Sequence, residues 1–346
     1  MGPVADIRNL TFAELRAEFD SWGEPAYRAK QVFEWIYQKG ADSFAAMTDL
    51  PKSLRQRLED KFRLGVLELA EQLRSEDGTE KLLFRLTDGQ LIEAVLIPSG
   101  GRRTLCLSTQ VGCKFACVFC ASGAGGFARN LLPSEMLGQI LFLRDKLDVG
   151  LTNFVFMGMG EPLDNLDNLV RTVRIMNAPE GMGIAARRMT ISTVGIVPAI
   201  EKLEGLGLQV SLSLSLHATT DELRSRLLPV NRKYPLAEVV KAGAHYARTT
   251  GRMITIEYIL ISSLNDSAAD ARRLASIARK LRAKINLIPY SQGCGAGFAP
   301  SPGSRQQAFL QTLESLGVAA TVRRSKGGDI RAACGQLAGK KRGTCF

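Results

Sequence analysis

The pattern of apolar and polar positions predicts helices in the first sixty residues of the chain. Apolar side chains recur there at helical spacing, and Thr11 followed by Glu14 forms a capping box at the start of the first helix. A second helix is expected over residues 24–38, and a third over residues 49–58. This part of the chain is therefore expected to be a small helical unit.

From about residue 66 the periodicity changes. Residues 66–98 alternate at every second position and turn at Gly89, which predicts a β-hairpin. Apolar strands then alternate with amphipathic helices, and a last helix and strand are expected over 304–316 and 319–323. Six strands are expected at 104–108, 153–157, 189–193, 209–216, 254–261 and 284–289, with helices between them at 134–147, 166–176, 197–206, 236–249 and 268–281.

Apolar strands separated by helices indicate an α/β fold with a parallel sheet and crossover helices. We expect a partial barrel of six β/α units, whose chemistry gathers at the carboxyl ends of the strands, and a doubly wound open sheet is the alternative. The chain is divided accordingly into a helical N-terminal accessory domain (1–65), the hairpin linker (66–98), the core barrel (99–327) and a C-terminal loop (328–346).

The charge is unevenly distributed between these parts. Residues 1–97 hold 13 Lys and Arg against 17 Asp and Glu, whereas the remainder holds 32 against 17, and the whole chain carries +11. Such a basic surplus favours a phosphate backbone, although a solvated basic surface explains it equally well. The chain has neither a membrane-spanning apolar run nor an N-terminal signal segment, so we expect a cytoplasmic protein without membrane contact.

Seven cysteines and only two histidines limit the chemistry of the chain. Three of the cysteines, Cys113, Cys117 and Cys120, follow the first barrel strand within eight residues. Thiolates at this spacing can hold three irons of a four-iron, four-sulfur cluster and leave the fourth iron open. A structural zinc site would require a fourth ligand close by, and inert buried thiols rarely cluster so closely.

Glycine and polar residues stand at or near the ends of several expected strands. Glycine lets the backbone approach a ligand, and a carboxylate there can pair with an ammonium group. Without further information these residues also fit tight turns and hydrogen-bonded strand ends. They are Gly160, Glu161, Ser192, Ser215, His217 and Asn286.

Three further residues with reactive side chains lie outside these groups. Glu93 interrupts the apolar run 91–96, where burial would suit it to act as a general base, but the exposed face of an alternating strand is an equally good explanation. Cys106 lies on the first barrel strand and Cys334 in a loop rich in glycine and alanine. Isolated cysteines of this kind are more often small core residues than catalysts.

Together these segments resemble the radical S-adenosylmethionine enzymes, and more narrowly the dual-specificity adenine carbon-2 methyltransferases of 23S ribosomal RNA and transfer RNA. The matching segments are 105–113, 127–131, 156–162, 192–195, 213–218, 286–289 and 332–337. The resemblance implies one four-iron cluster held by Cys113, Cys117 and Cys120, and two molecules of S-adenosylmethionine per turnover. The cofactor contacts that it implies are Gly160, Glu161, Ser192, Ser215, Leu216, His217 and Asn286.

The resemblance also implies catalytic roles for Glu93, Cys106 and Cys334. In the family, the late cysteine receives a methyl group from one S-adenosylmethionine, and a radical generated from a second one removes a hydrogen atom from that group. The carbon radical adds to adenine carbon 2, so that Cys334 would be linked to RNA. Glu93 would accept a proton, and Cys106 would attack the Cys334 sulfur, release methyladenine and leave a transient disulfide.

Two other functions stay open at this point. The related adenine carbon-8 methyltransferases of ribosomal RNA, which confer antibiotic resistance, share the cluster and both outer cysteines. A non-catalytic iron–sulfur protein that binds RNA would explain the cluster and the charge, but not the polar strand ends. Methylthiotransferases are disfavoured because residues 1–105 contain no cysteine for a second cluster.

The partners expected from the resemblance are 23S ribosomal RNA, transfer RNA and an external electron donor of flavodoxin or ferredoxin type. We expect the protein itself to be a monomer. Cys294 and Cys345 match no family motif and receive no role.

Overall fold

The computed structural model describes residues 4–65, 67–291, 297–323 and 325–339. The first described segment forms the predicted helical unit. Its helices are α1 (Phe12–Ser21), α2 (Ala26–Tyr37) and α3 (Lys52–Lys61), and the short strands β1 (Ala5–Asp6) and β2 (Phe62–Arg63) pair in parallel. The predicted capping box is present, because Thr11 Oγ1 accepts the Glu14 N–H and Glu14 Oε2 accepts the Thr11 N–H.

Ten strands from the rest of the chain form one mixed sheet. Seven of its strands are parallel and follow one another in chain order, so every crossover moves the chain in the same direction along the sheet. A doubly wound sheet reverses direction once, so that alternative is wrong and the partial barrel is confirmed. The parallel strands are β6 (Arg102–Cys106), β9 (Asn153–Phe156), β10 (Met189–Thr193), β11 (Ser211–Ser215), β12 (Thr255–Leu260), β13 (Lys284–Pro289) and β14 (Ala320–Val322).

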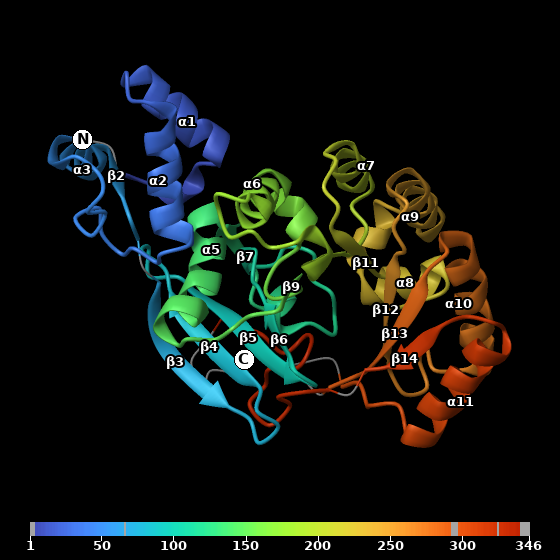
Figure 1. The fold of residues 1–346 in the computed structure, drawn as a ribbon. Helices are drawn as coiled ribbons and strands as arrows, with labels where there is room; N and C mark the ends of the chain where they lie inside the picture. The colour runs from blue at the N-terminus through green and yellow to red at the C-terminus, as the bar shows by residue number, and fades with distance from the viewer. Residues whose placement is uncertain (1–3, 66, 292–296, 324, 340–346) are drawn as a thin grey trace.

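The helices of the barrel cover the outside of this sheet (Figure 1). Their bounds agree with the predicted ones to within a few residues, except that the first helix turns into a π-helix over Phe142–Lys146. These helices are α5 (Pro133–Leu141), α6 (Leu166–Asn177), α7 (Val197–Gly205), α9 (Leu236–Thr250), α10 (Ala268–Leu281) and α11 (Gly303–Ser315). Helix α8 (Asp221–Leu227) was not expected from the sequence. Within the described residues, no helix combines the length and hydropathy needed to span a membrane.

The predicted hairpin is part of a larger antiparallel extension. Strands β4 (Glu80–Arg85) and β5 (Leu91–Ser99) form that hairpin, and β3 (Glu68–Arg74) pairs with β4 at the edge of the sheet. Most β3 side chains are polar and only partly buried, so its hydrophobic alternation is weak. Strand β5 pairs antiparallel with β6, which joins the extension to the barrel.

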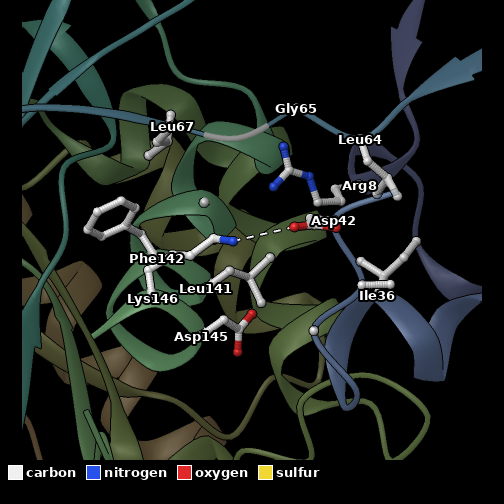
Figure 2. A pocket seen from close by; sticks show the side chains of 13 residues that line it. Arg8, Ile36, Asp42, Leu64, Gly65, Leu67, Leu141, Phe142, Asp145 and Lys146 are labelled. Atoms are coloured by element: carbon white, nitrogen blue, oxygen red, sulfur yellow. Dashed lines mark hydrogen bonds and ion pairs between the residues drawn. The ribbon is translucent and has the colours of Figure 1, made fainter. Parts of the chain in front are cut away.

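The N-terminal helices are held against the barrel by apolar and polar contacts. Figure 2 shows a small cavity at this joint, where Ile36 and Leu64 face Leu141. An ion pair of 3.4 Å between Asp42 and Lys146 spans the joint. The helical unit therefore packs directly on the first crossover helix of the barrel.

Candidate active site

The three clustered cysteines lie in a loop between two short paired strands. Strand β7 (Gln110–Gly112) pairs antiparallel with β8 (Phe127–Asn130), and the loop from Cys113 to Gly126 closes between them. Gly112 has a φ of +74°, and a Cβ there would lie 1.9 Å from the Gly126 carbonyl oxygen, so only glycine fits. The same oxygen accepts the Cys113 N–H at 2.8 Å.

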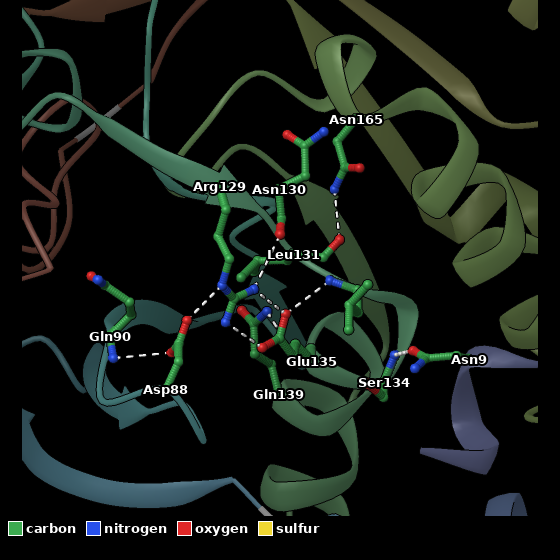
Figure 3. A network of polar contacts seen from close by, with 11 residues as sticks. Asn9, Asp88, Gln90, Arg129, Asn130, Leu131, Ser134, Glu135, Gln139 and Asn165 are labelled. Atoms are coloured by element: carbon green, nitrogen blue, oxygen red, sulfur yellow. Dashed lines mark hydrogen bonds and ion pairs between the residues drawn. The ribbon is translucent and has the colours of Figure 1, made fainter. Parts of the chain in front are cut away.

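Strand β8 is fixed by a polar network around Arg129 (Figure 3). The Arg129 guanidinium donates two hydrogen bonds of 2.7 and 2.8 Å to the Glu135 carboxylate on α5, and one of 2.7 Å to Asp88 in the β4–β5 turn. The hydrogen bond from Arg129 is the largest of the effects that lower the Asp88 pKa. The cysteine loop is thereby anchored to both the extension and the barrel.

A cavity of about 900 Å³, which includes space open to solvent, lies at the carboxyl ends of the parallel strands. This is the position expected for the chemistry of a β/α barrel. All three clustered cysteines and five of the polar or glycine residues predicted from the sequence line it together. These residues are Cys113, Cys117, Cys120, Gly160, Glu161, Ser192, Ser215 and His217.

The three thiols fit an iron–sulfur cluster better than a single metal ion. No group of three or more His, Cys, Asp or Glu among the described residues could hold one ion, which disfavours a zinc site. A four-iron cluster instead needs each thiolate on a different iron, so its ligands stand apart around a cavity. Burial raises the pKa of Cys113 to about 12 and raises that of Cys117, so thiolate formation there requires a metal.

Glu161 provides the feature that fits the amino group of S-adenosylmethionine. The carboxylate is 3% exposed, and burial raises its pKa to about 7. It accepts the backbone N–H groups of Val194 at 2.9 Å and Leu163 at 3.0 Å, and no cation pairs with it in the part of the chain that the structure describes. A buried carboxylate of this kind at a cavity wall suits an ammonium ligand.

Gly160, beside Glu161, brings the backbone close to strand β7. Its φ is +96°, and a Cβ there would lie 2.5 Å from the Gln110 side chain. Gln110 in turn accepts the Glu161 N–H at 2.9 Å through its side-chain oxygen. The glycine therefore allows the contact that orients Glu161.

The other predicted cofactor contacts divide into two groups. The hydroxyls of Ser192 and Ser215 line the cavity, and their oxygen atoms lie 3.2 Å apart. The Nδ1 atom of His217 accepts a hydrogen bond of 3.1 Å from the backbone N–H of Ile259. Burial lowers the pKa of His217 to about 3, which keeps the ring neutral. Leu216 and Asn286 are not among the residues that line the cavity, and their role stays a prediction.

Three charged residues at the site were missed by the sequence analysis. Glu257 is 3% exposed and lines the cavity; its Oε1 accepts the Asn286 amide at 3.1 Å, and its Oε2 has no hydrogen-bond partner within the described chain. A single carboxylate in the apolar strand 254–261 was the available signal. Arg323, which the sequence distinguishes from the other cations in no way, lines the same cavity.

The third missed residue, Arg224 on α8, is fully buried without a carboxylate partner in the described residues. Its guanidinium donates to the Val194 carbonyl at 2.6 Å, the Leu216 carbonyl at 3.3 Å and Asn231 at 2.7 Å. Burial lowers its pKa to about 10. It holds together the loops that follow β10 and β11.

Cys106 and Cys334 line one side cavity of about 480 Å³, which also reaches Cys120 and Arg323. Cys106 is buried at the end of β6, and Cys334 is accessible from the cavity. Desolvation by the surrounding protein raises the pKa of both thiols, that of Cys106 to about 12, whereas the nearby Arg323 charge opposes this rise. The structure thus brings together two cysteines that are 228 positions apart in the sequence.

Glu93 is buried rather than exposed, so the interpretation of it as a surface residue of β5 is wrong. Its carboxylate pairs with Lys81 at 3.1 Å and accepts the N–H groups of Ala338 at 2.7 Å and Gly339 at 3.2 Å. It therefore holds the C-terminal loop a few residues beyond Cys334. The structure does not describe Cys294 or Cys345.

Comparisons with known proteins agree with this site. A family profile described as the ribosomal RNA large subunit methyltransferase N-terminal domain matches residues 5–64, and the radical SAM superfamily profile matches residues 107–275. A probable dual-specificity RNA methyltransferase RlmN from Gemmatimonas aurantiaca is 50% identical over 316 residues, which cover 91% of this chain and 87% of that protein. The dual-specificity RNA methyltransferase RlmN of Geobacter sulfurreducens is 45% identical over 340 residues, 98% of this chain and 94% of that protein.

A solved structure gives the same result for the fold. The crystal structure of a radical SAM methyltransferase from Sphaerobacter thermophilus superimposes with a TM-score of 0.91 at 44% identity. The match covers 97% of this chain and 100% of the other. The likeness therefore includes the N-terminal helices and the extension as well as the barrel.

Proposed function

The chain belongs to the family of radical S-adenosylmethionine dual-specificity RNA methyltransferases, and from this membership we propose that it methylates carbon 2 of an adenine in 23S ribosomal RNA and in transfer RNA. The family assigns an enzyme with a four-iron cluster and S-adenosylmethionine. The observation that supports the proposal best is the cavity shared by three clustered cysteines, Glu161 and Cys334.

Each expected residue has a defined task in this reaction. Cys113, Cys117 and Cys120 would hold the cluster, which when bound supplies the electron that cleaves S-adenosylmethionine to a radical. Glu161 would bind the cofactor's ammonium group, and Ser192 and Ser215 would offer hydroxyls to its polar groups. These assignments rest on the position of each side chain at the cavity wall.

Cys334 would carry the methyl group, and Cys106 would attack its sulfur once the base is joined to it. The side cavity that both thiols line supports this pairing, because such an attack requires the two sulfurs to meet. Glu93 would accept the proton that leaves adenine carbon 2. Its hydrogen bonds to residues 338 and 339 keep it tied to the loop that carries Cys334.

The remaining parts of the proposal concern partners. RNA is the substrate of the family, and we propose that the helical unit of residues 1–65 contributes to its recognition. The electron donor would be a flavodoxin or ferredoxin. A monomer is supported by the small number of large apolar side chains that stay exposed in the described chain: Val4, Tyr27, Val118, Phe127, Leu132 and Met253.

Mass spectrometry of nucleosides tests the proposal. The anaerobically reconstituted protein, with reductant and S-adenosylmethionine, is incubated with unmodified 23S ribosomal RNA and with transfer RNA. The proposal expects 2-methyladenosine in both. Formation of 8-methyladenosine would show that the enzyme methylates carbon 8 instead of carbon 2. The absence of any methylated adenosine in both RNAs would contradict the proposed function.

A further inference from the structure

Cys334 also lines a further cavity, and none of the three clustered cysteines is part of its lining. It encloses about 1450 Å³, including space open to solvent. Strands β5 and β6 form one wall, strands β13 and β14 the other, and the C-terminal loop with Cys334 closes it. The cavity thus lies where β14 ends the sheet and the partial barrel stays open.

One face of β6 leads from the mouth of this cavity toward the thiols. Thr104 pairs with Ile97, and Arg102 pairs with Ser99, so these four side chains share a face of the sheet. Cys106 is two residues beyond Thr104 and belongs to the same face. Arg102 and Cys106 are therefore separated by about 13 Å along the strand.

The charge of the cavity is of one sign. Its described lining holds Arg102, Arg323 and Lys326, hydroxyls of Ser99, Thr104 and Ser325, and no carboxylate. The Arg102 side chain has no hydrogen bond or ion pair within the described residues. Lys326 is fixed at the wall, where its Nζ donates to the Pro98 carbonyl at 2.6 Å. Such a set of cations without an acid suits phosphate groups.

We propose that this cavity receives the target adenosine of the RNA, and that Arg102 and Lys326 bind the phosphate groups beside it. The inference rests on the proposed function and adds to it a binding site for the nucleotide. The base would then reach Cys334 from this cavity, which adjoins the cluster cavity at Ile288 and Arg323. RNA and S-adenosylmethionine would thereby approach the same thiol from separate cavities, because Cys334 lines both.

Arg103 offers a matched control for this proposal. It follows Arg102 on β6, but its Nε donates to the Gly150 carbonyl at 2.7 Å, and it does not line the cavity. Successive residues of a strand point to opposite faces, which explains the difference. An Arg103→Gln variant removes the same charge at nearly the same place without touching the cavity.

The test measures binding of a transfer RNA transcript to the cluster-loaded protein as salt rises from about 50 to about 200 mM. We expect Arg102→Gln and Lys326→Gln each to weaken binding about tenfold and to reduce the slope of log affinity against log salt by about 1. The Michaelis constant for RNA should rise as well, whereas the dissociation constant of S-adenosylmethionine should not. Arg103→Gln should bind RNA within about twofold of wild type.

Two results would overturn the inference: wild-type RNA affinity and slope in both cavity variants, or an equal loss in Arg103→Gln. If Lys326→Gln does not fold, Arg102→Glu is used in its place. Because it reverses the charge, Arg102→Glu should weaken RNA binding more than Arg102→Gln does. The wild-type protein separates this inference from the proposed function. If the wild type makes methyladenosine but the cavity variants match it in RNA affinity, only the nucleotide site is wrong; if the wild type makes none, the function itself fails.

Discussion

The Oε2 atom of Glu93 accepts the backbone N–H of Ala338 at 2.7 Å, so the extension directly holds the loop that carries Cys334. The same carboxylate is the proposed proton acceptor. Its two tasks can be separated, because glutamine keeps an oxygen that accepts a hydrogen bond but cannot take up a proton.

Substitution of Glu93 tests this separation. Glu93→Gln should still accept a methyl group on Cys334 but should release methylated RNA about 100-fold more slowly, the usual loss for a missing general base. Glu93→Ala should impair both steps and lower the free energy of unfolding by about 3 kcal/mol, since Lys81 loses its buried partner. Protein mass and RNA product are measured in parallel. Glu80→Gln, on the neighbouring strand, is the control, and wild-type turnover by Glu93→Gln would exclude the base role.

Loss of one cluster ligand should prevent the protein from binding the iron–sulfur cluster and from methylating RNA, because only three ligands are expected to hold the cube. The variants are Cys113→Ala, Cys117→Ala and Cys120→Ala. Iron content and the visible charge-transfer absorption report this loss. Cys106→Ala, the control, removes a thiol that does not line the cluster cavity and should keep its iron. Normal absorption and activity in one of the three variants would show that the ligand set is different.

Substitutions of Cys334 and Cys106 should block different steps of the reaction. Cys334→Ala should lose methyl incorporation into both protein and RNA. Cys106→Ala should accept the methyl group on Cys334 and then stall as a covalent protein–RNA species, because no second thiol can attack the Cys334 sulfur. Denaturing gels and intact mass detect that species. Normal turnover by Cys106→Ala would contradict the covalent route.

His217 should make stability depend on pH. Its pKa is lowered to about 3 in the folded protein, whereas the unfolded residue has a pKa near 6.5. Below pH 6.5 the unfolded chain therefore binds a proton that the folded chain refuses, and stability falls. Between pH 7 and pH 5 this residue should cost about 2 kcal/mol.

The measurement is denaturant unfolding of wild type and His217→Asn at both pH values. The Asn Oδ1 can still accept the Ile259 N–H, so the variant removes the titration while keeping the hydrogen bond. The loss of stability between pH 7 and pH 5 should shrink by about 2 kcal/mol in the variant. His245→Asn, beside Glu204 on the surface, serves as control. An unchanged pH dependence in His217→Asn would refute the assignment.

Arg224→Met should lower the free energy of unfolding by about 3 kcal/mol, since the carbonyls of Val194 and Leu216 lose a buried donor. Binding of S-adenosylmethionine should weaken as well, because these loops form the cavity wall. Equilibrium dialysis and thermal unfolding are the two measurements. Arg226→Met, on the exposed side of the same helix, should leave both unchanged.

Most of the barrel could be predicted because its strands are buried on both faces. The segment at 189–193 holds only Met, Ile, Ser and Thr and no charged residue, and the structure has a largely buried strand with those bounds. The segment 66–98 was predicted as a two-stranded hairpin, and β3 was not recognised as a separate third strand because an edge strand with partly exposed side chains has a weak pattern. The cysteine loop was identified by spacing, which does not depend on tertiary contacts.

The rest of the site depends on contacts between distant segments. Arg323 was known only as one of many cations, because its proximity to Cys106 and Cys334 arises from the closure of β14 against the C-terminal loop. The burial of Glu93 was likewise undecided in the sequence. An alternating strand can present either face to the core, and only the loop at 338 and 339 covers this residue.

Several hydrogen bonds attach the C-terminal segment that carries Cys334 to the extension. Asp329 accepts from Ser75, Gly327 donates to Asp77, and Lys326 donates to Pro98, with partners 228 to 254 positions apart. A nascent chain that grows by about 5 to 20 residues per second reaches residue 326 roughly 10 to 50 s after the extension has been made. Throughout that interval the barrel strands can form, but the extension still lacks the segment that carries Cys334, so the reactive centre is assembled last during synthesis.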